Sequence, residues 1–153
     1  MTKPTITVVI PAYNREKTIL RSVKSVLSQT LPPDEIIVVD DGSSDRTVEF
    51  LEGLHEPSLK ICCDSTNRGA QHARNCGIEL ASSDWVAFND SDDFWLPRKL
   101  ELQVKELEKT NYHPQVVLYS DMWLWSKNEA AFDVEWIRYP SYEGDKPLLD
   151  IFS

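Results

Sequence analysis

The sequence lacks the features of a membrane-spanning or secreted protein. None of its apolar runs reaches the roughly 18 residues that a transmembrane helix needs, and its start, Met1-Thr-Lys-Pro4, does not resemble a secretory signal. Cysteine is scarce: Cys62, Cys63 and Cys76 fit neither a disulfide framework nor the usual zinc spacing. We therefore expect a reducing compartment and a cytoplasmic protein, either free or at the inner face of the membrane.

Positive charge is also in short supply. The 153 residues contain 16 lysines and arginines against 25 aspartates and glutamates, which gives a formal net charge of −9. This balance disfavours a nucleic-acid groove or an anionic membrane surface as a partner. An anionic ligand would bind against a repulsive background, so a bound cation would help to hold it.

The common phosphate-binding loops are missing as well. There is no Gly-x-x-x-x-Gly-Lys sequence, and Gly69 and Gly77 do not belong to a Gly-x-Gly-x-x-Gly fingerprint. The calcium-loop pattern fails because Phe94 stands at a ligand position. A diphosphate would therefore need other groups to neutralise its charge.

A regular alternation of strand and helix patterns is present. The predicted strands span 5–10, 35–39, 59–63, 85–88 and 115–119, the predicted helices span 15–30, 44–54, 70–81 and 97–110, and a further strand is expected within 132–138. In the third helix, Ala73, Ile78 and Leu80 are the candidates to face inward. This order is typical of an α/β fold: a mostly parallel sheet with helices on both faces, a three-layer sandwich.

Three carboxylates follow the apolar run 85–88 within four residues: Asp90, Asp92 and Asp93. Carboxylates about 4 Å apart repel by roughly 4 kcal/mol at an effective dielectric constant of about 20. A hard divalent ion such as Mg²⁺ or Mn²⁺ would offset this repulsion. A turn followed by a helix N-cap explains the same residues equally well.

Polar side chains follow three of the predicted strands, at 11–15, 40–45 and 89–93. In parallel α/β sheets, ligands bind outside the carboxyl ends of the strands, where the strand order switches. We therefore expect these segments to converge on one edge of the sheet and to form a site there.

Most residues near these strand ends have two interpretations. Tyr13 could stack on a base or pack at the sheet edge, and Asp41 could accept a base N–H or stabilise a turn. Arg15 could contact phosphate or be solvated, and Arg74 could form a structural ion pair or contact a ligand. The histidines show no mutual spacing typical of a metal site, and each is expected to be structural or solvated: His55, His72 and His113.

Four ordered motifs resemble one known family. They are Val8-Val-Ile-Pro-Ala-Tyr-Asn-Arg15, Ile36-Ile-Val-Val-Asp-Asp-Gly-Ser-Ser-Asp-Arg-Thr47, Asn67-Arg-Gly69 with Ala73-Arg-Asn-Cys-Gly77, and Asn89-Asp-Ser-Asp-Asp93. From Ile6 to about Tyr119 the chain resembles a family-two glycosyltransferase of the Rossmann-like GT-A fold. The resemblance implies inverting transfer of a sugar from a nucleoside-diphosphate donor, UDP-linked by preference, with Mn²⁺ or Mg²⁺, in polysaccharide or glycoconjugate synthesis. The acceptor would be a sugar, or a lipid-linked or protein-linked molecule.

The resemblance also implies roles for individual residues. Pro11, Ala12 and Tyr13 would line the nucleoside pocket, with Arg15 nearby. Asp41 would read the base with support from Asp40, and Asn67 and Gly69 would lie on the loop beside it. In Asp90-Ser91-Asp92, which matches the family's Asp-x-Asp, Asp90 and Ser91 would face the donor and Asp92, with Asp90, would hold the metal.

The family's catalytic base lies well downstream of the Asp-x-Asp. The later acids match no motif: Asp133, Glu135, Glu143 and Asp145. We therefore expect one glycosyltransferase domain over 1–153, cut short at its C-terminus, with the base beyond Ser153. Residues 1–119 would form the nucleotide-binding half, and 120–153 would begin the acceptor side.

Three other functions are compatible with parts of the pattern. A non-catalytic nucleotide-sugar-binding or assembly module would share the donor motifs and lack the base. A phosphatase using Asp90 as nucleophile would need Ser or Thr where Phe94 stands. A sugar nucleotidyltransferase would need a glycine-rich basic loop in place of Pro11-Ala-Tyr-Asn-Arg15.

Overall fold

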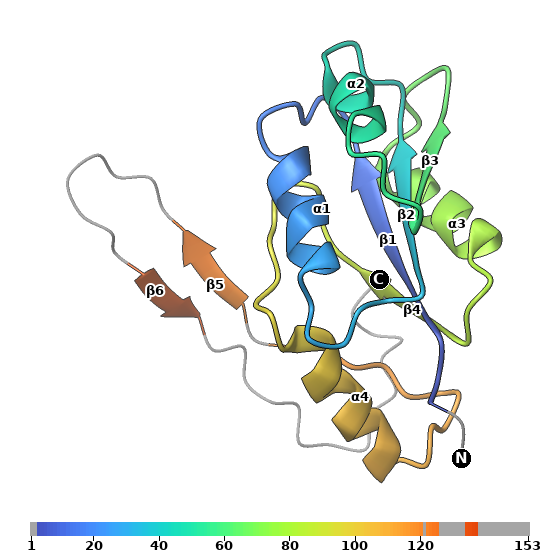
Figure 1. Cartoon of the computed structure of the whole chain (residues 1–153), viewed down its shortest axis with the longest axis vertical. Helices are drawn as coiled ribbons and strands as arrows, with labels where there is room; N and C mark the ends of the chain where they lie inside the picture. The colour runs from blue at the N-terminus through green and yellow to red at the C-terminus, as the bar shows by residue number, and fades with distance from the viewer. Residues whose placement is uncertain (1–2, 121, 126–133, 138–153) are drawn as a thin grey trace. The chain divides into compact units, whose positions relative to one another are not determined.

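The computed structural model describes residues 3–120, 122–125 and 134–137 (Figure 1). The chain divides into two compact units, Met1–His113 and Pro114–Ser153. In the described residues, no helix has the length and apolar character needed to cross a membrane.

The first unit alternates strands and helices throughout. In chain order these are β1 (Ile6–Ala12), α1 (Ile19–Leu27), β2 (Glu35–Asp40), α2 (Thr47–Glu52), β3 (Leu59–Cys63), α3 (Ala70–Leu80), β4 (Trp85–Phe88) and α4 (Lys99–Lys109). The four strands form a parallel sheet in the order β3-β2-β1-β4. The α/β fold with a parallel sheet is confirmed.

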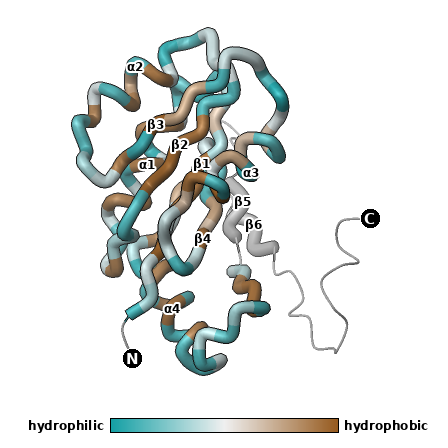
Figure 2. Tube along the Cα trace, turned by 90° about the vertical axis from the view of Figure 1, so that its right-hand side faces the viewer, coloured by the Kyte–Doolittle hydropathy of each residue, from teal (hydrophilic) through white to brown (hydrophobic). Residues whose placement is uncertain are grey.

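Alternate residues of the central strands face two different helical layers, because side chains along a strand point to opposite faces. Val8, Ile10, Ile36 and Val38 belong to the larger core with residues of α1, α2 and α4. On the other face, Ile37 and Val39 pack with Ala73 of α3. The sheet is therefore the middle of three layers, as predicted, and Figure 2 shows the hydrophobic residues concentrated along its strands.

Helix α3 approaches the sheet through small residues. Ala73 and Gly77 are buried, whereas Ile78 and Leu80 are 47% and 50% exposed, so the prediction that these two face inward was wrong. A Cβ atom on Gly77 would lie 2.2 Å from Cγ1 of Val9. This close contact turns the large residues at 78 and 80 toward the outside.

The first helix begins later than predicted. Residues 15–18 form a turn in which the amide of Ile19 donates to the carbonyl of Arg15 at 2.9 Å, and α1 starts at Ile19 instead of Arg15. Its Ile19, Val23 and Val26 are fully buried. The turn keeps Arg15 at the end of β1, among the polar strand ends.

The strand predicted at 115–119 is not formed. Residues 116–120 have no regular secondary structure. Among its described residues, the second unit forms the antiparallel pair β5 (Met122–Trp125) and β6 (Val134–Ile137). An apolar run becomes a strand only where a neighbour completes its backbone hydrogen bonds, and among the described residues β4 pairs with β1 alone. Strand β6 falls within the expected 132–138, whose remaining residues lie outside the described part.

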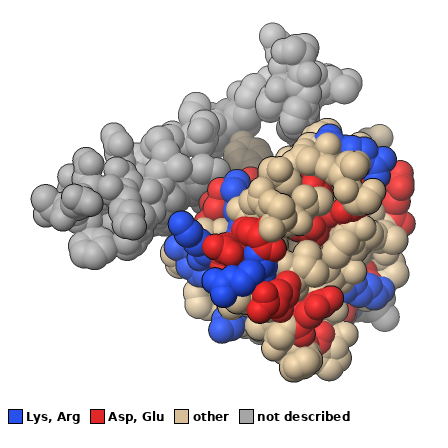
Figure 3. Space-filling model, turned by 90° about the horizontal axis from the view of Figure 1, so that it is seen from above, with Lys and Arg blue, Asp and Glu red and all other residues tan. Residues whose placement is uncertain are grey.

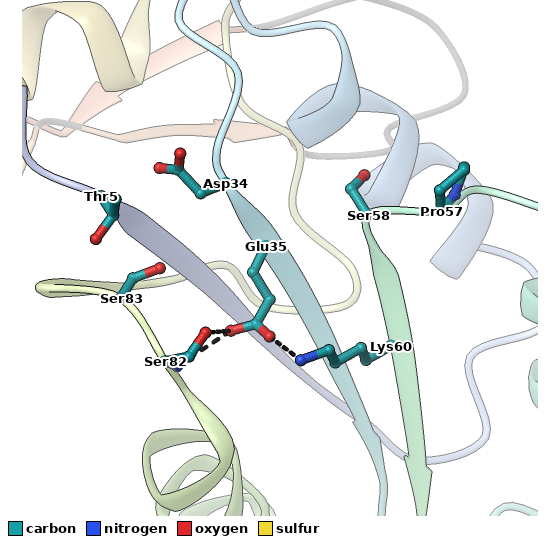
Figure 4. Close-up of a pocket in the computed structure, with 8 residues that line it drawn as sticks. All are labelled: Thr5, Asp34, Glu35, Pro57, Ser58, Lys60, Ser82 and Ser83. Carbon is teal, nitrogen blue, oxygen red and sulfur yellow. Dashed lines mark hydrogen bonds and ion pairs between the residues drawn. The ribbon is translucent and has the colours of Figure 1, made fainter.

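The amino edge of the sheet contains a buried acid. The Glu35 carboxylate accepts a hydrogen bond from the Thr7 hydroxyl at 2.8 Å. It also accepts the Ser82 amide at 3.3 Å and pairs with Lys60 (Figure 4). A pocket of about 290 Å³ lies beside it. These bonds join β1, β2, β3 and the segment between α3 and β4, at the end of the sheet opposite to the loops that follow the strands.

Candidate functional site at the carboxyl edge of the sheet

The polar segments that follow β1, β2 and β4 meet at the point where the strand order switches. Strand β1 lies between β2 and β4, so the chain moves outward to β3 and then returns to the other side of β1. Ligands of open α/β sheets bind outside the carboxyl ends at such a point. Figure 3 views the molecule from this end, where acidic and basic side chains lie side by side.

Hydrogen bonds join the loop after β1 to the loop after β2. The Asn14 amide donates to the Ser43 hydroxyl at 2.8 Å, and the Ser44 amide donates to Asn14 Oδ1 at 2.9 Å. Asn14 has a positive φ of 52°, a conformation that asparagine tolerates better than most residues. The Arg15 amide donates to Thr47 Oγ1 at 2.7 Å, which ties the turn before α1 to the start of α2.

Asp41 joins the loop after β2 to the loop after β3. Its side chain is buried, and its two carboxylate oxygens accept the backbone amides of Arg68 at 2.8 Å and Gly69 at 2.7 Å. Its own amide donates to the Ala12 carbonyl at 2.8 Å. Asp41 therefore connects three segments of the chain, a role that its position in the sequence did not reveal.

Gly42 permits this close approach of the two loops. Its φ is +78°, and a Cβ atom at this position would lie 3.0 Å from a backbone carbon of Thr66. A larger residue would therefore push away the segment that supplies the amides to Asp41. Asp40, just before, accepts the Ser43 amide at 2.9 Å through Oδ2, while its buried Oδ1 has no hydrogen-bond partner among the described residues.

The acids after β4 are paired with arginines from other elements. Arg74 of α3 contacts Asp90 Oδ1 at 2.6 Å, and Arg15 lies 3.4 Å from Asp92 Oδ2. Arg21 of α1 donates to the backbone carbonyl of Asp92 at 2.7 Å. The side chains of Asp90 and Asp92 are about half exposed, so these ion pairs can open at little cost in free energy.

The electrostatics of this loop suit a cation. Burial and the neighbouring charges of Asp90 and Asp92 raise the pKa of Asp93 above its ordinary value. Within the part of the chain that the structure describes, these acids do not form a compact set of ligand atoms. They fit an ion such as Mg²⁺, which binds through one or two carboxylates together with substrate phosphates.

Buried polar residues hold the loop 89–93 after β4, here called the acid loop, against β1 and α1. Asn89 is buried; its amide donates to the Val9 carbonyl at 3.1 Å, and its Nδ2 donates to Ser22 Oγ at 2.9 Å. Ser22 in turn donates to the carbonyl of Asp90 at 3.2 Å. Ser91 is also buried. The loop is therefore anchored to β1 and α1 while its acids reach solvent.

The structure brings most of the predicted site residues to this edge. Pro11 and Ala12 are buried at the end of β1, Tyr13 is 43% exposed, and Arg15 lies beside Asp92. Asn67 accepts the Gly69 amide at 3.1 Å within its own loop. The sequence reasoning missed Arg21, because a single arginine on an amphipathic helix carries no signal of its tertiary partner.

Comparison with known proteins identifies relatives of this arrangement. The profile of Glycosyl transferase family 2 matches residues 7–150. The chain is 39% identical over 106 residues to an Escherichia coli protein named UDP-Glc:alpha-D-GlcNAc-diphosphoundecaprenol beta-1,3-glucosyltransferase WfgD, a match that covers 69% of this chain and 42% of that protein. It is 36% identical to the succinoglycan biosynthesis protein ExoO of Rhizobium meliloti, over 69% of this chain and 30% of the other.

Solved structures show the same fold. Staphylococcus aureus TarS 1-349 in complex with UDP-GlcNAc aligns with a TM-score of 0.65 and 30% identity, over 70% of this chain and 32% of that one. The complex of the same protein with UDP aligns with a TM-score of 0.64. The chain spans less than half the length of the curated relatives named here.

Proposed function

This chain belongs to glycosyl transferase family 2, and from that premise we propose that it forms the donor-binding part of an inverting glycosyltransferase that uses a UDP-sugar. The observation that carries the proposal is the meeting of the loops after β1 and β4, where Arg15 and Asp92 lie 3.4 Å apart. The four-stranded parallel sheet has the GT-A arrangement that the resemblance implied.

The end of β1, together with Asp41 and the loops after β2 and β3 that it connects, would form the nucleoside pocket. Tyr13 is exposed enough to stack on a base, beside the buried Pro11 and Ala12. Each carboxylate oxygen of Asp41 accepts one backbone amide and has acceptor capacity for a second donor, such as a base N–H. Asn67 and Gly69 belong to the loop that Asp41 holds and would border the base.

The arginines and acids at the other side of β1 would bind the diphosphate. Arg15 and Arg74 can exchange their contacts with Asp92 and Asp90 for phosphate oxygens, because exposed ion pairs are worth only about 0–1 kcal/mol. A Mn²⁺ or Mg²⁺ ion held by Asp92 and Asp90 would neutralise the diphosphate and stabilise the leaving group as a Lewis acid. Ser91 would position these two acids from its buried place between them.

We assign the catalytic base to none of the described carboxylates. Inverting transfer needs a carboxylate that takes the proton of the acceptor hydroxyl, and Asp90 and Asp92 would be occupied on the donor side. The names of WfgD and ExoO refer to a diphosphoundecaprenol-linked substrate and to succinoglycan. We accordingly propose a lipid-linked or sugar acceptor in polysaccharide synthesis, handled at the inner face of the membrane.

Calorimetric titration with UDP tests the proposal. The chain should bind UDP more tightly with Mn²⁺ than with EDTA, and Asp92→Asn should remove the difference because the metal loses its main ligand. Asp84→Asn is the matched control, since it removes the same charge at the amino edge, where Asp84 accepts the Thr5 amide at 3.0 Å. If UDP does not bind under either condition, the proposed function is wrong; if Asp92→Asn keeps the full metal effect, the metal assignment is wrong.

A further inference from the structure

A second set of ligand-type side chains lies outside the acid loop, between β3 and α3. Asp64 follows β3 directly, and His72 and Cys76 are four residues apart on α3, which places them on one helix face. His72 Nε2 is 3.2 Å from Cys76 Sγ and 3.2 Å from Asp64 Oδ2. The three ligand atoms all lie within 4.8 Å of one another.

Two of these distances are close to those of a tetrahedral zinc site. Zinc binds sulfur at about 2.3 Å and nitrogen or oxygen at about 2.0–2.2 Å, so neighbouring ligand atoms are separated by roughly 3.3–3.6 Å. The set of one thiolate, one imidazole and one carboxylate also suits zinc better than Mg²⁺ or Ca²⁺, which prefer oxygen ligands alone. Two of the ligand pairs are therefore close to the spacing that the metal would impose.

The Asp64 carboxylate is already prepared for a single metal bond. Arg68 donates to Oδ1 at 2.9 Å, which leaves Oδ2 to face His72. Oδ2 is buried and accepts no hydrogen bond from the described residues, although His72 Nε2 lies 3.2 Å from it. A buried carboxylate oxygen without a donor is costly, and a cation at this point would satisfy it.

The fold explains why these residues meet. Side chains alternate along β3, so Asp64 follows Cys62 on the face that packs on α3. The side chains of Asp64 and His72 are 21% and 29% exposed. The site is thus partly covered but open enough for an ion to enter and for water to complete its coordination.

We propose that Asp64 Oδ2, His72 Nε2 and Cys76 Sγ bind a zinc ion, with water as the fourth ligand. The site would fasten the segment 64–69 to α3. The same segment supplies the Arg68 and Gly69 amides to Asp41, so the metal would hold one border of the candidate nucleoside pocket. This zinc site is separate from the ion that Asp92 would hold.

Cobalt(II) substitution under reducing conditions distinguishes the two metal sites. A thiolate ligand gives a sulfur-to-cobalt charge-transfer band, which the carboxylates of the acid loop cannot produce. The full chain should show this band with one equivalent of cobalt, and zinc should displace it. Cys76→Ser should abolish the band, whereas Cys63→Ser, which removes an exposed thiol next to the site, should keep it.

Zinc affinity measured by competition with a chelator gives a second readout. His72→Gln should weaken zinc binding by more than about tenfold, since even outer partners of metal ligands cost about 10–100-fold. This variant also covers the case in which Cys76→Ser does not fold, because His72 is partly exposed. Absence of the band in the unaltered chain, or a band that survives Cys76→Ser, would overturn the proposal and leave a hydrogen-bonded trio.

Discussion

Replacing Asp41 by asparagine tests whether the connection between the loops after β2 and β3 contributes to stability. The carboxylate accepts the Arg68 and Gly69 amides at 2.8 and 2.7 Å, one on each oxygen, and it is only 2% exposed. Asparagine has the same shape but a single acceptor oxygen. Its NH₂ group would therefore face one of the two backbone N–H donors.

The expected loss follows from these contacts. A hydrogen bond to a charged group contributes about 1.5–3 kcal/mol, and a buried unsatisfied donor costs about 1–3 kcal/mol. Removal of a buried charge gives back part of this loss, because the carboxylate no longer needs to be desolvated. We expect the free energy of unfolding to fall by about 2 kcal/mol, a large share of the roughly 5–15 kcal/mol typical of a domain.

Urea denaturation measures the fall in the free energy of unfolding, and hydrogen exchange measures how easily the segment 64–69 opens. If the segment 64–69 opens about 2 kcal/mol more easily, protection of the Arg68 and Gly69 amides should fall roughly 30-fold. Asp34→Asn is the control: the exposed Asp34 accepts the Ile6 amide at 2.8 Å through one oxygen, which asparagine can replace. Unchanged protection at Arg68 and Gly69 in Asp41→Asn would refute the role of Asp41 as a connector.

Two substitutions away from the site test the packing and the electrostatics of the sheet. Gly77→Ala places a Cβ 2.2 Å from Cγ1 of the buried Val9, so it should lower the free energy of unfolding, measured by urea denaturation, by about 1–3 kcal/mol. In the control Gly53→Ala, the new Cβ meets nothing closer than 3.5 Å, so this variant should be neutral or stabilising. Equal effects of the two substitutions would contradict the packing argument. Burial alone raises the pKa of Glu35, but its bonds to Lys60 and to neighbouring hydroxyl and amide groups outweigh burial and hold the pKa below its ordinary value. Ionised Glu35 therefore stabilises the fold above about pH 4.3 and loses this effect as the pH falls. At pH 7, Glu35→Gln should unfold at a lower urea concentration than the unaltered chain, and the difference between the two urea midpoints should narrow in acid. A difference that stays constant with pH would contradict this role of Glu35.

The fold was largely predictable because its two central strands, β1 and β2, are buried on both faces. The residues of β1 and β2 are all buried, and such strands form continuous apolar runs that sequence patterns reveal. The helix predicted at 97–110 forms at Lys99–Lys109, and it buries Leu100, Val104 and Leu107. The run at 115–119 failed because strand formation depends on a partner, which local pattern does not specify.

The site was predictable in its place but not in its contacts. Topology placed the polar ends of β1, β2 and β4 on one edge, and the structure shows them there. The hydrogen bonds from the Arg68 and Gly69 amides to Asp41 depend on how two loops pack against each other, which local sequence does not specify. Gly42 is the one residue beside Asp41 whose type indicates this close approach. The sequence spacing of His72 and Cys76 does not indicate a metal site, because the third member of the cluster, Asp64, comes from the end of β3.

The arrangement of arginines changes the argument from net charge. From the net charge of −9 we expect a bound cation to help hold an anionic ligand. The structure also draws Arg15, Arg21 and Arg74 from three different elements to the acid loop. Without a ligand they balance its carboxylates, so the edge is not a simple negative surface. In the proposed function, a metal diphosphate would replace the pairs of Arg15 with Asp92 and of Arg74 with Asp90. The cation would bind the acids and the phosphates would bind the arginines, so donor binding would leave the local charge nearly balanced.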